Sequence, residues 1–181
     1  MLPARAASGQ SLPVAVGQEH EQAVAALKAK GIDFHEETAG TGKRITYGAA
    51  GESVTLDFTM WPGDSNAPAS SWESADTSNK RLLLTHILDV APGSEARRDW
   101  VRTFEKEGGH WAYLSEKAMA QRPAAQRARY PVVAFLQWPG SSGSFPVTFL
   151  FQAARPAGTP PGKETTALEV FLENPHKPRL F

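Results

Sequence analysis

Hydrophobic and polar residues recur along this chain with two different periods, one typical of helices and the other of strands. The places where one period gives way to the other predict where the helices and strands begin and end. Residues 18–30 place apolar side chains three or four positions apart, which predicts a helix that Gly31 closes. Residues 53–61 alternate strictly, with apolar side chains at even positions and mainly polar ones at odd positions. This second pattern predicts a strand that buries one face and leaves the other polar, as in an antiparallel sheet covered on one side.

Alternation or strand-length apolar blocks predict six more strands, over residues 32–37, 44–47, 81–90, 130–138, 145–153 and 165–173. Two further helices are predicted over residues 95–107 and 115–129. Pro123 should end or kink the second of them, because proline lacks the N–H that a helix interior needs. The Pro-, Gly- and Ser-rich residues 139–144 are typical of a hairpin loop.

The order of these elements predicts an α+β fold. Helices do not alternate singly with strands, which disfavours a doubly wound parallel sheet. We expect a mostly antiparallel sheet of six to seven strands with two or three helices packed on one face. The 181 residues suit a single domain over 14–173, with halves 14–90 and 91–173, a flexible lead 1–13 and a tail 174–181. No apolar run approaches the ~18 residues of a membrane-spanning helix.

Composition and charge remove several classes of protein. The chain has no cysteine, which excludes disulfides and thiolate-ligated metals. Lys and Arg number 19 and Asp and Glu also 19, so no global positive field recruits nucleic acid. The net charge of zero is the sum of two opposite charges, because residues 1–90 carry a net negative charge and residues 91–181 carry a net positive charge. The excess of positive charge lies mostly in residues 97–129.

No catalytic or metal-binding pattern in the sequence predicts a cofactor. The five histidines lack the spacing of a helical metal site, and there is no phosphate loop or dinucleotide-binding glycine motif. Two pairings could support acid–base chemistry. His35 and Glu37 share one face of a strand, and His86 lies near Asp89. In both cases a structural role is the stronger interpretation, so we predict no catalytic residue, no metal and no cofactor.

Aromatic and basic residues provide the candidate binding sites. Trp61 and Trp138 end predicted strands beside loops, and Trp72 lies within a polar loop. Tryptophan at such places is a frequent anchor for a partner. The basic segment adds Arg122, Arg127 and Arg129, a surface that could meet an acidic partner. The partner we expect is another protein rather than nucleic acid.

Residues 14–60 resemble a module of bacterial envelope proteins. The similarity lies in Val14-Ala15-Val16-Gly17, in the helical segment Ala23–Gly31 and in the alternating strand Val54–Met60. These residues resemble the helix-plus-hairpin module that is found in the outer-membrane assembly lipoprotein BamE and in the β-lactamase inhibitory proteins. The chain departs from those families in lacking cysteine and in its predicted helices at 95–129. The resemblance implies a non-catalytic module that binds through an exposed sheet face, in the periplasm or cell envelope, while a cytoplasmic location stays open.

The leading functional hypothesis is therefore a non-enzymatic binding or protein-interaction module. Two alternatives remain. One is a small enzyme that uses a histidine–carboxylate pair, and the other is a regulatory protein that acts through the basic residues 97–129.

Overall fold

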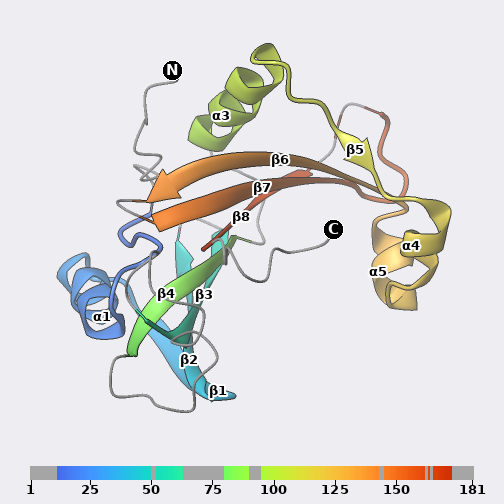
Figure 1. The fold of residues 1–181 in the computed structure, drawn as a ribbon. Helices are drawn as coiled ribbons and strands as arrows, with labels where there is room; N and C mark the ends of the chain where they lie inside the picture. The colour runs from blue at the N-terminus through green and yellow to red at the C-terminus, as the bar shows by residue number, and fades with distance from the viewer. Residues whose placement is uncertain are drawn as a thin grey trace.

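One antiparallel sheet of eight strands runs through the part of the chain that the structure describes (Figure 1). The computed structural model describes residues 12–49, 52–62, 80–89, 95–142, 145–161, 163 and 165–172. The helices are α1 (His20–Ala29), α3 (Glu95–Lys106), α4 (Glu116–Ala120) and α5 (Ala124–Arg129). The strands are β1 (Phe34–Ala39), β2 (Gly42–Ala49), β3 (Glu52–Trp61), β4 (Arg81–Asp89), β5 (Ala112–Tyr113), β6 (Val132–Ser142), β7 (Phe145–Arg155) and β8 (Thr165–Leu172).

The strand order divides the sheet into two meanders. It reads β1-β2-β3-β4-β8-β7-β6-β5, so the last strand of each four-stranded meander pairs with that of the other. Among the described residues, four pairs are in register across this β4–β8 seam, from His86↔Phe171 to Asp89↔Leu168. In Figure 1 the long strands β6 and β7 run across the direction of β3 and β4, as the cumulative twist of a large sheet produces.

The predicted α+β class with a mostly antiparallel sheet is confirmed, but the strand count is not. The described sheet has eight strands rather than six or seven. The addition is β5, whose two residues pair with Ala134 and Phe135 of β6. Two residues are too few to display a period of two, so the sequence pattern predicts no element there.

The main cluster of buried apolar side chains lies on one face of the sheet, which we call the apolar face. The alternation of β3 is confirmed, since Val54, Leu56 and Phe58 are buried and belong to the core cluster. From α1, Ala23 and Leu27 are completely buried against this cluster, and α3 adds Val101 and Phe104. These two helices cover the apolar face because each presents an apolar stripe to it.

The packing of the helices differs from the prediction. Neither α4 nor α5 has a buried residue, and both lie at one end of the sheet instead of on its apolar face (Figure 1). The predicted break at Pro123 is confirmed, because Pro123 is the N-cap of α5 and separates it from α4. Helices this short, without an apolar stripe, have nothing to bury against the sheet.

The hairpin of β6 and β7 is longer than predicted. Residues 139–142, which the composition indicates as loop, pair in register with β7 down to Ser142↔Phe145. Gly140 permits this pairing, since a Cβ there would lie 2.5 Å from the ring of Phe149. Leu114 N donates to Val133 O, so odd-numbered β6 residues turn their backbone polar groups toward the outer edge. Pro139 is one of them and has no N–H to leave unpaired.

The tripeptide Trp-Pro-Gly occurs twice in the sequence, at residues 61–63 and 138–140, which raises the question of an internal duplication, but the two tryptophans do not occupy equivalent places. Trp61 ends β3, the third strand of the first meander, whereas Trp138 lies in β6, the second strand of the other. The two copies of the tripeptide lie in strands with different places in their meanders. The repeated tripeptide therefore gives no evidence of an internal duplication.

Candidate functional site

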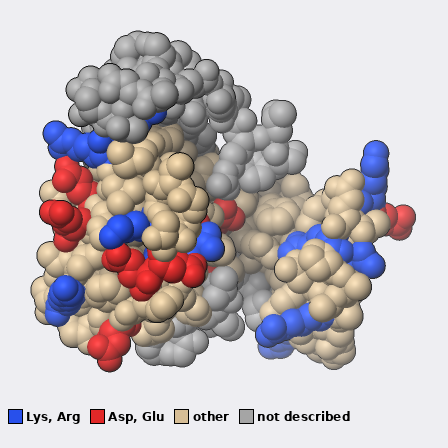
Figure 2. All heavy atoms as spheres, turned by 90° about the horizontal axis from the view of Figure 1, so that it is seen from below, with Lys and Arg blue, Asp and Glu red and all other residues tan. Residues whose placement is uncertain are grey.

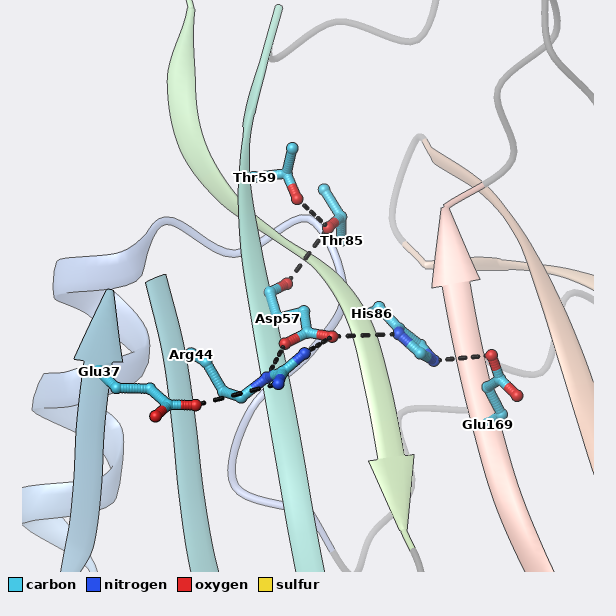
Figure 3. Close-up of polar contacts among 7 residues, drawn as sticks. All are labelled: Glu37, Arg44, Asp57, Thr59, Thr85, His86 and Glu169. Carbon is cyan, nitrogen blue, oxygen red and sulfur yellow. Dashed lines mark hydrogen bonds and ion pairs between the residues drawn. The ribbon is translucent and has the colours of Figure 1, made fainter. Parts of the chain in front are cut away.

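Five polar side chains, four of them from Asp, Glu or Arg and one from His, cross the polar face of the sheet, one from each of five adjacent strands. They are Glu37, Arg44, Asp57, His86 and Glu169, and we call them the polar row (Figure 3). The first four stand opposite one another in the register of β1 to β4, and the fifth reaches in from β8. The row therefore depends on both the strand alternation and the pairing order of strands far apart in sequence.

The strongest contact in the polar row joins Arg44 to Asp57. Nε of Arg44 donates to one carboxylate oxygen at 2.6 Å, and an Nη atom donates to the other at 3.2 Å. This hydrogen-bonded carboxylate raises the pKa of the Arg44 guanidinium above its usual value. On the other side of Arg44, Glu37 lies 3.9 Å away, at the limit of an ion pair.

His86 lies between two carboxylates. Its Nδ1 is 3.4 Å from Asp57 and its Nε2 is 2.8 Å from Glu169. The contact with Glu169 is close but lacks the alignment of a hydrogen bond, so it acts as an ion pair only when the imidazole is protonated. Because Glu169 belongs to β8, this contact crosses the seam between the two meanders.

A β-bulge places His86 in the polar row. The register of β3 and β4 shifts after Asp57↔His86, so that Phe58 stands opposite Leu84 and Thr85 is the extra residue. The hydroxyl of Thr85 donates to the backbone oxygen of Asp57 at 3.2 Å and lies 3.0 Å from the Thr59 hydroxyl (Figure 3). These bonds fix the bulge, and with it the position of His86.

The predicted pair of His86 and Asp89 is not formed. Asp89 is completely buried and stands in register with Val54 and Leu168, both of which belong to the apolar face. His86 projects from the polar face, so the sheet itself separates the two side chains. Strand alternation by itself places residues three positions apart on opposite faces, and the register from His86 to Asp89 is uninterrupted, so the short interval in sequence did not indicate a contact.

His35 and Glu37 do share one face, as the strand alternation predicts. Together with Thr46 and Ser53 they line a shallow depression of about 580 Å³ over β1, β2 and β3. The side chain of Glu37 also belongs to the polar row, so the depression adjoins that row at the edge strand β1.

A larger groove lies where β5 meets β6 and α4. It encloses about 1040 Å³. Its apolar lining consists of Ala112, Leu114, Phe135, Leu136, Pro139 and Leu150. The turn after α3, with Gly109 and His110, forms one wall, and Ser115 and Ala118 of the α4 region form another. Gly109 suits this wall because a Cβ there would lie 2.8 Å from a backbone oxygen.

Tyr113 borders this groove and is the exposed large hydrophobic residue of the described chain. Its side chain is 72% exposed, and its strand β5 is the last in the sheet. Sequence reasoning missed this residue, because nothing in the pattern around it predicts a strand. The groove was missed for a different reason, because its walls come from five separate segments that no local pattern relates to one another.

The three arginines predicted as binding residues lie together in the projecting segment 115–130, which we call the basic lobe. Arg127 donates to the backbone oxygens of Ala120 and Arg122 at 2.6 and 2.8 Å, and so ties α4 to α5. The guanidinium of Arg129 lies over the ring of Tyr130 at 5.2 Å. Figure 2 shows Lys and Arg side chains gathered on the lobe that protrudes to the right.

The predicted tryptophan anchors do not gather at this site. Trp61 is half-buried and packs against the core cluster. Trp72 lies outside the described residues. Trp138 is placed by its backbone in β6, opposite Phe149, and its side chain also lies outside the described part.

Comparisons with known proteins give no relative. No family model, no curated protein and no solved structure matches the chain. Among the described helices none is long and apolar enough to cross a membrane. Across the same residues, no group of three His, Asp or Glu side chains is placed to hold a metal ion.

Proposed function

We propose that this protein is a non-catalytic protein-interaction module that binds its partner in the groove between β5, β6 and α4. The observation that carries the proposal is the position of Tyr113, 72% exposed at the rim of a groove of about 1040 Å³. A large aromatic side chain left in water beside an apolar concavity is the usual composition of a binding surface.

The lining of the groove supports this proposal. Most of its side chains are apolar, and the polar ones are few, among them Glu107, His110 and Gln137. Exposed apolar patches with a polar rim are uncommon on proteins that bind nothing, because they cost solvation free energy. Binding would remove Tyr113 and the groove lining from water together.

The polar row is a weaker candidate for the binding surface. The resemblance to envelope binding modules favours an exposed sheet face, but the charged side chains of this face already contact one another from Glu37 to Glu169. A partner would have to replace those contacts, so the row is better explained as a link between strands.

The polar row also gives little support to the enzyme hypothesis. His86 has two carboxylate neighbours, as a general base could, but a base also needs a cavity in which a substrate can approach it. Neither the depression over β1 to β3 nor the groove beside β5 is lined by Asp57, His86 or Glu169.

A random peptide library displayed on phage tests the proposal, because such a selection requires no identified partner. The library is selected on the immobilised protein, and the enriched clones are then measured against Tyr113→Ala. We expect this variant to lose roughly tenfold or more in affinity, the loss typical of a central aromatic anchor. The matched control is Glu37→Ala on β1, at the opposite edge of the sheet, which should bind as the wild type does. Failure to enrich clones, or equal binding to Tyr113→Ala, would refute the proposal.

A further inference from the structure

We infer that the segment bound in the groove is acidic as well as apolar, so that its carboxylates meet the basic lobe while its apolar side chains fill the groove. This inference rests on the proposed function, and it adds the chemical class of the partner. Three observations support it: the net positive charge of the lobe, the lack of carboxylate partners for its cations among the described residues, and the segment that the lobe shares with the groove.

The lobe carries an excess of positive charge. Between residues 115 and 130 the sequence has four basic side chains, Lys117, Arg122, Arg127 and Arg129, and one acidic side chain, Glu116. In Figure 2 the lobe stands apart from the rest of the molecule, where Lys, Arg, Asp and Glu are interspersed. A carboxylate that approaches the lobe therefore meets a net attraction.

The cations of the lobe have no carboxylate partner among the described residues. The arginines contact neutral groups instead, such as the backbone oxygens held by Arg127 and the ring beneath Arg129. The cations on the sheet differ, since Lys43, Arg44 and Arg81 are each paired with a carboxylate. Within the described fold, the positive charge of the lobe is therefore not neutralised by carboxylates, and it is available to a partner.

The lobe and the groove share the segment around α4. Ser115 and Ala118 line the groove. Lys117 directly precedes Ala118 in α4, and Arg122 directly follows Gln121, the C-cap of this helix. A segment whose apolar side chains occupy the groove therefore ends close to these two cations.

The combination favours a protein segment over a polyanion such as nucleic acid. Nucleic acid would use the cations of the lobe but would leave the apolar groove and Tyr113 in water. A purely apolar ligand would fill the groove and make no use of the charge. A segment with both kinds of side chain uses both surfaces, and the charge would also accelerate its association.

The test uses the peptides selected on the wild-type protein. We expect Asp and Glu to be enriched in them together with apolar residues. Affinity should fall as NaCl rises from about 0.1 M to about 1 M, over which the Debye length shrinks from ~10 to ~3 Å. The double variant Lys117→Gln/Arg122→Gln should weaken binding roughly fivefold, the scale of two partly exposed charge contacts.

The control variant removes the same charge elsewhere. Lys28→Gln/Lys30→Gln at the end of α1 lowers the net charge equally, and it should leave the affinity unchanged. Selected peptides that are neutral or basic, or that bind both double variants like the wild type, would overturn the acidic partner while leaving the groove as the binding site.

Three other outcomes would overturn an acidic, apolar segment as the occupant of the groove. Acidic peptides that bind Tyr113→Ala unchanged would show attraction to charge alone, and an equally strong, Tyr113-independent response to DNA would assign the lobe to nucleic acid. A dimer in solution that Tyr113→Ala converts to monomer would assign the groove to a second copy of the chain.

Discussion

The link between Arg44 and Asp57 tests whether the polar row is structural. Two hydrogen bonds join one guanidinium to one carboxylate, and the side chains are 42% and 27% exposed. Hydrogen bonds to charged groups contribute about 1.5–3 kcal/mol when well shielded, whereas exposed ion pairs contribute about 0.2–1 kcal/mol. With the two-point geometry and this partial exposure, we expect a coupling free energy of about 1 kcal/mol between the two residues.

A double-mutant cycle measures this quantity. Arg44→Gln, Asp57→Asn and the double variant are compared with the wild type in urea unfolding. A change of about 1 kcal/mol in the free energy of unfolding corresponds to a midpoint shift of roughly 0.5 M, given a dependence on urea of about 2 kcal/mol per M. Asp57→Asn alone should cost somewhat more than the coupling, because it also weakens the contact with His86.

The cycle has an outcome that contradicts the structural interpretation. A coupling below about 0.3 kcal/mol, close to the error of such cycles, would mean that the charges of the row do not hold the strands together. The charged face would then need another explanation, and binding through this face would become the favoured one.

The other predictions concern packing, pH and local order. Gly140→Ala should lower the free energy of unfolding by about 1–3 kcal/mol, since its Cβ would overlap the ring of Phe149; an unchanged melting temperature would argue against this close approach. The hydrogen bond from Lys43 lowers the pKa of Glu36 below its ordinary value of 4.5. Glu36 therefore contributes stability above the unfolded-state pKa and loses it as the pH falls through the folded-state pKa. Urea unfolding measured across the acidic range should accordingly be less pH-dependent in Glu36→Gln, and parallel curves would contradict the assignment. Arg127→Ala should accelerate amide exchange in α4 and α5 with little change in global stability, because neither helix has a buried residue; unchanged exchange would mean that its two hydrogen bonds do not hold the lobe.

The local elements follow from the sequence because their causes are local. The helix α1 is specified by its apolar spacing and by Gly31, and the strand β3 by its strict alternation. The break between α4 and α5 follows from Pro123, whose ring and missing N–H act on its immediate neighbours. Charged residues at polar positions of predicted strands, such as Arg44 and Asp57, were the available signal for a polar row.

Which strands are neighbours, and which residues face each other, was decided only by the tertiary structure. The pairing of β4 with β8 joins residues 79 to 85 positions apart and brings Glu169 to His86. The bulge at Thr85 sets the face of His86, and Asp89 is buried on the opposite side. Alternation assigns each residue a face, but it does not fix strand order, register or bulges, which depend on the packing of the whole sheet.

The sequence by itself determined the fold class, most of the strands and the basic character of the segment that contains α4 and α5. The tertiary structure alone determined the groove, because its lining comes from separate segments that converge on β6. It also determined the exposure of Tyr113, which results from the place of β5 as the last strand of the sheet. Local patterns record what each segment buries, whereas a concave surface exists only after distant segments have packed together.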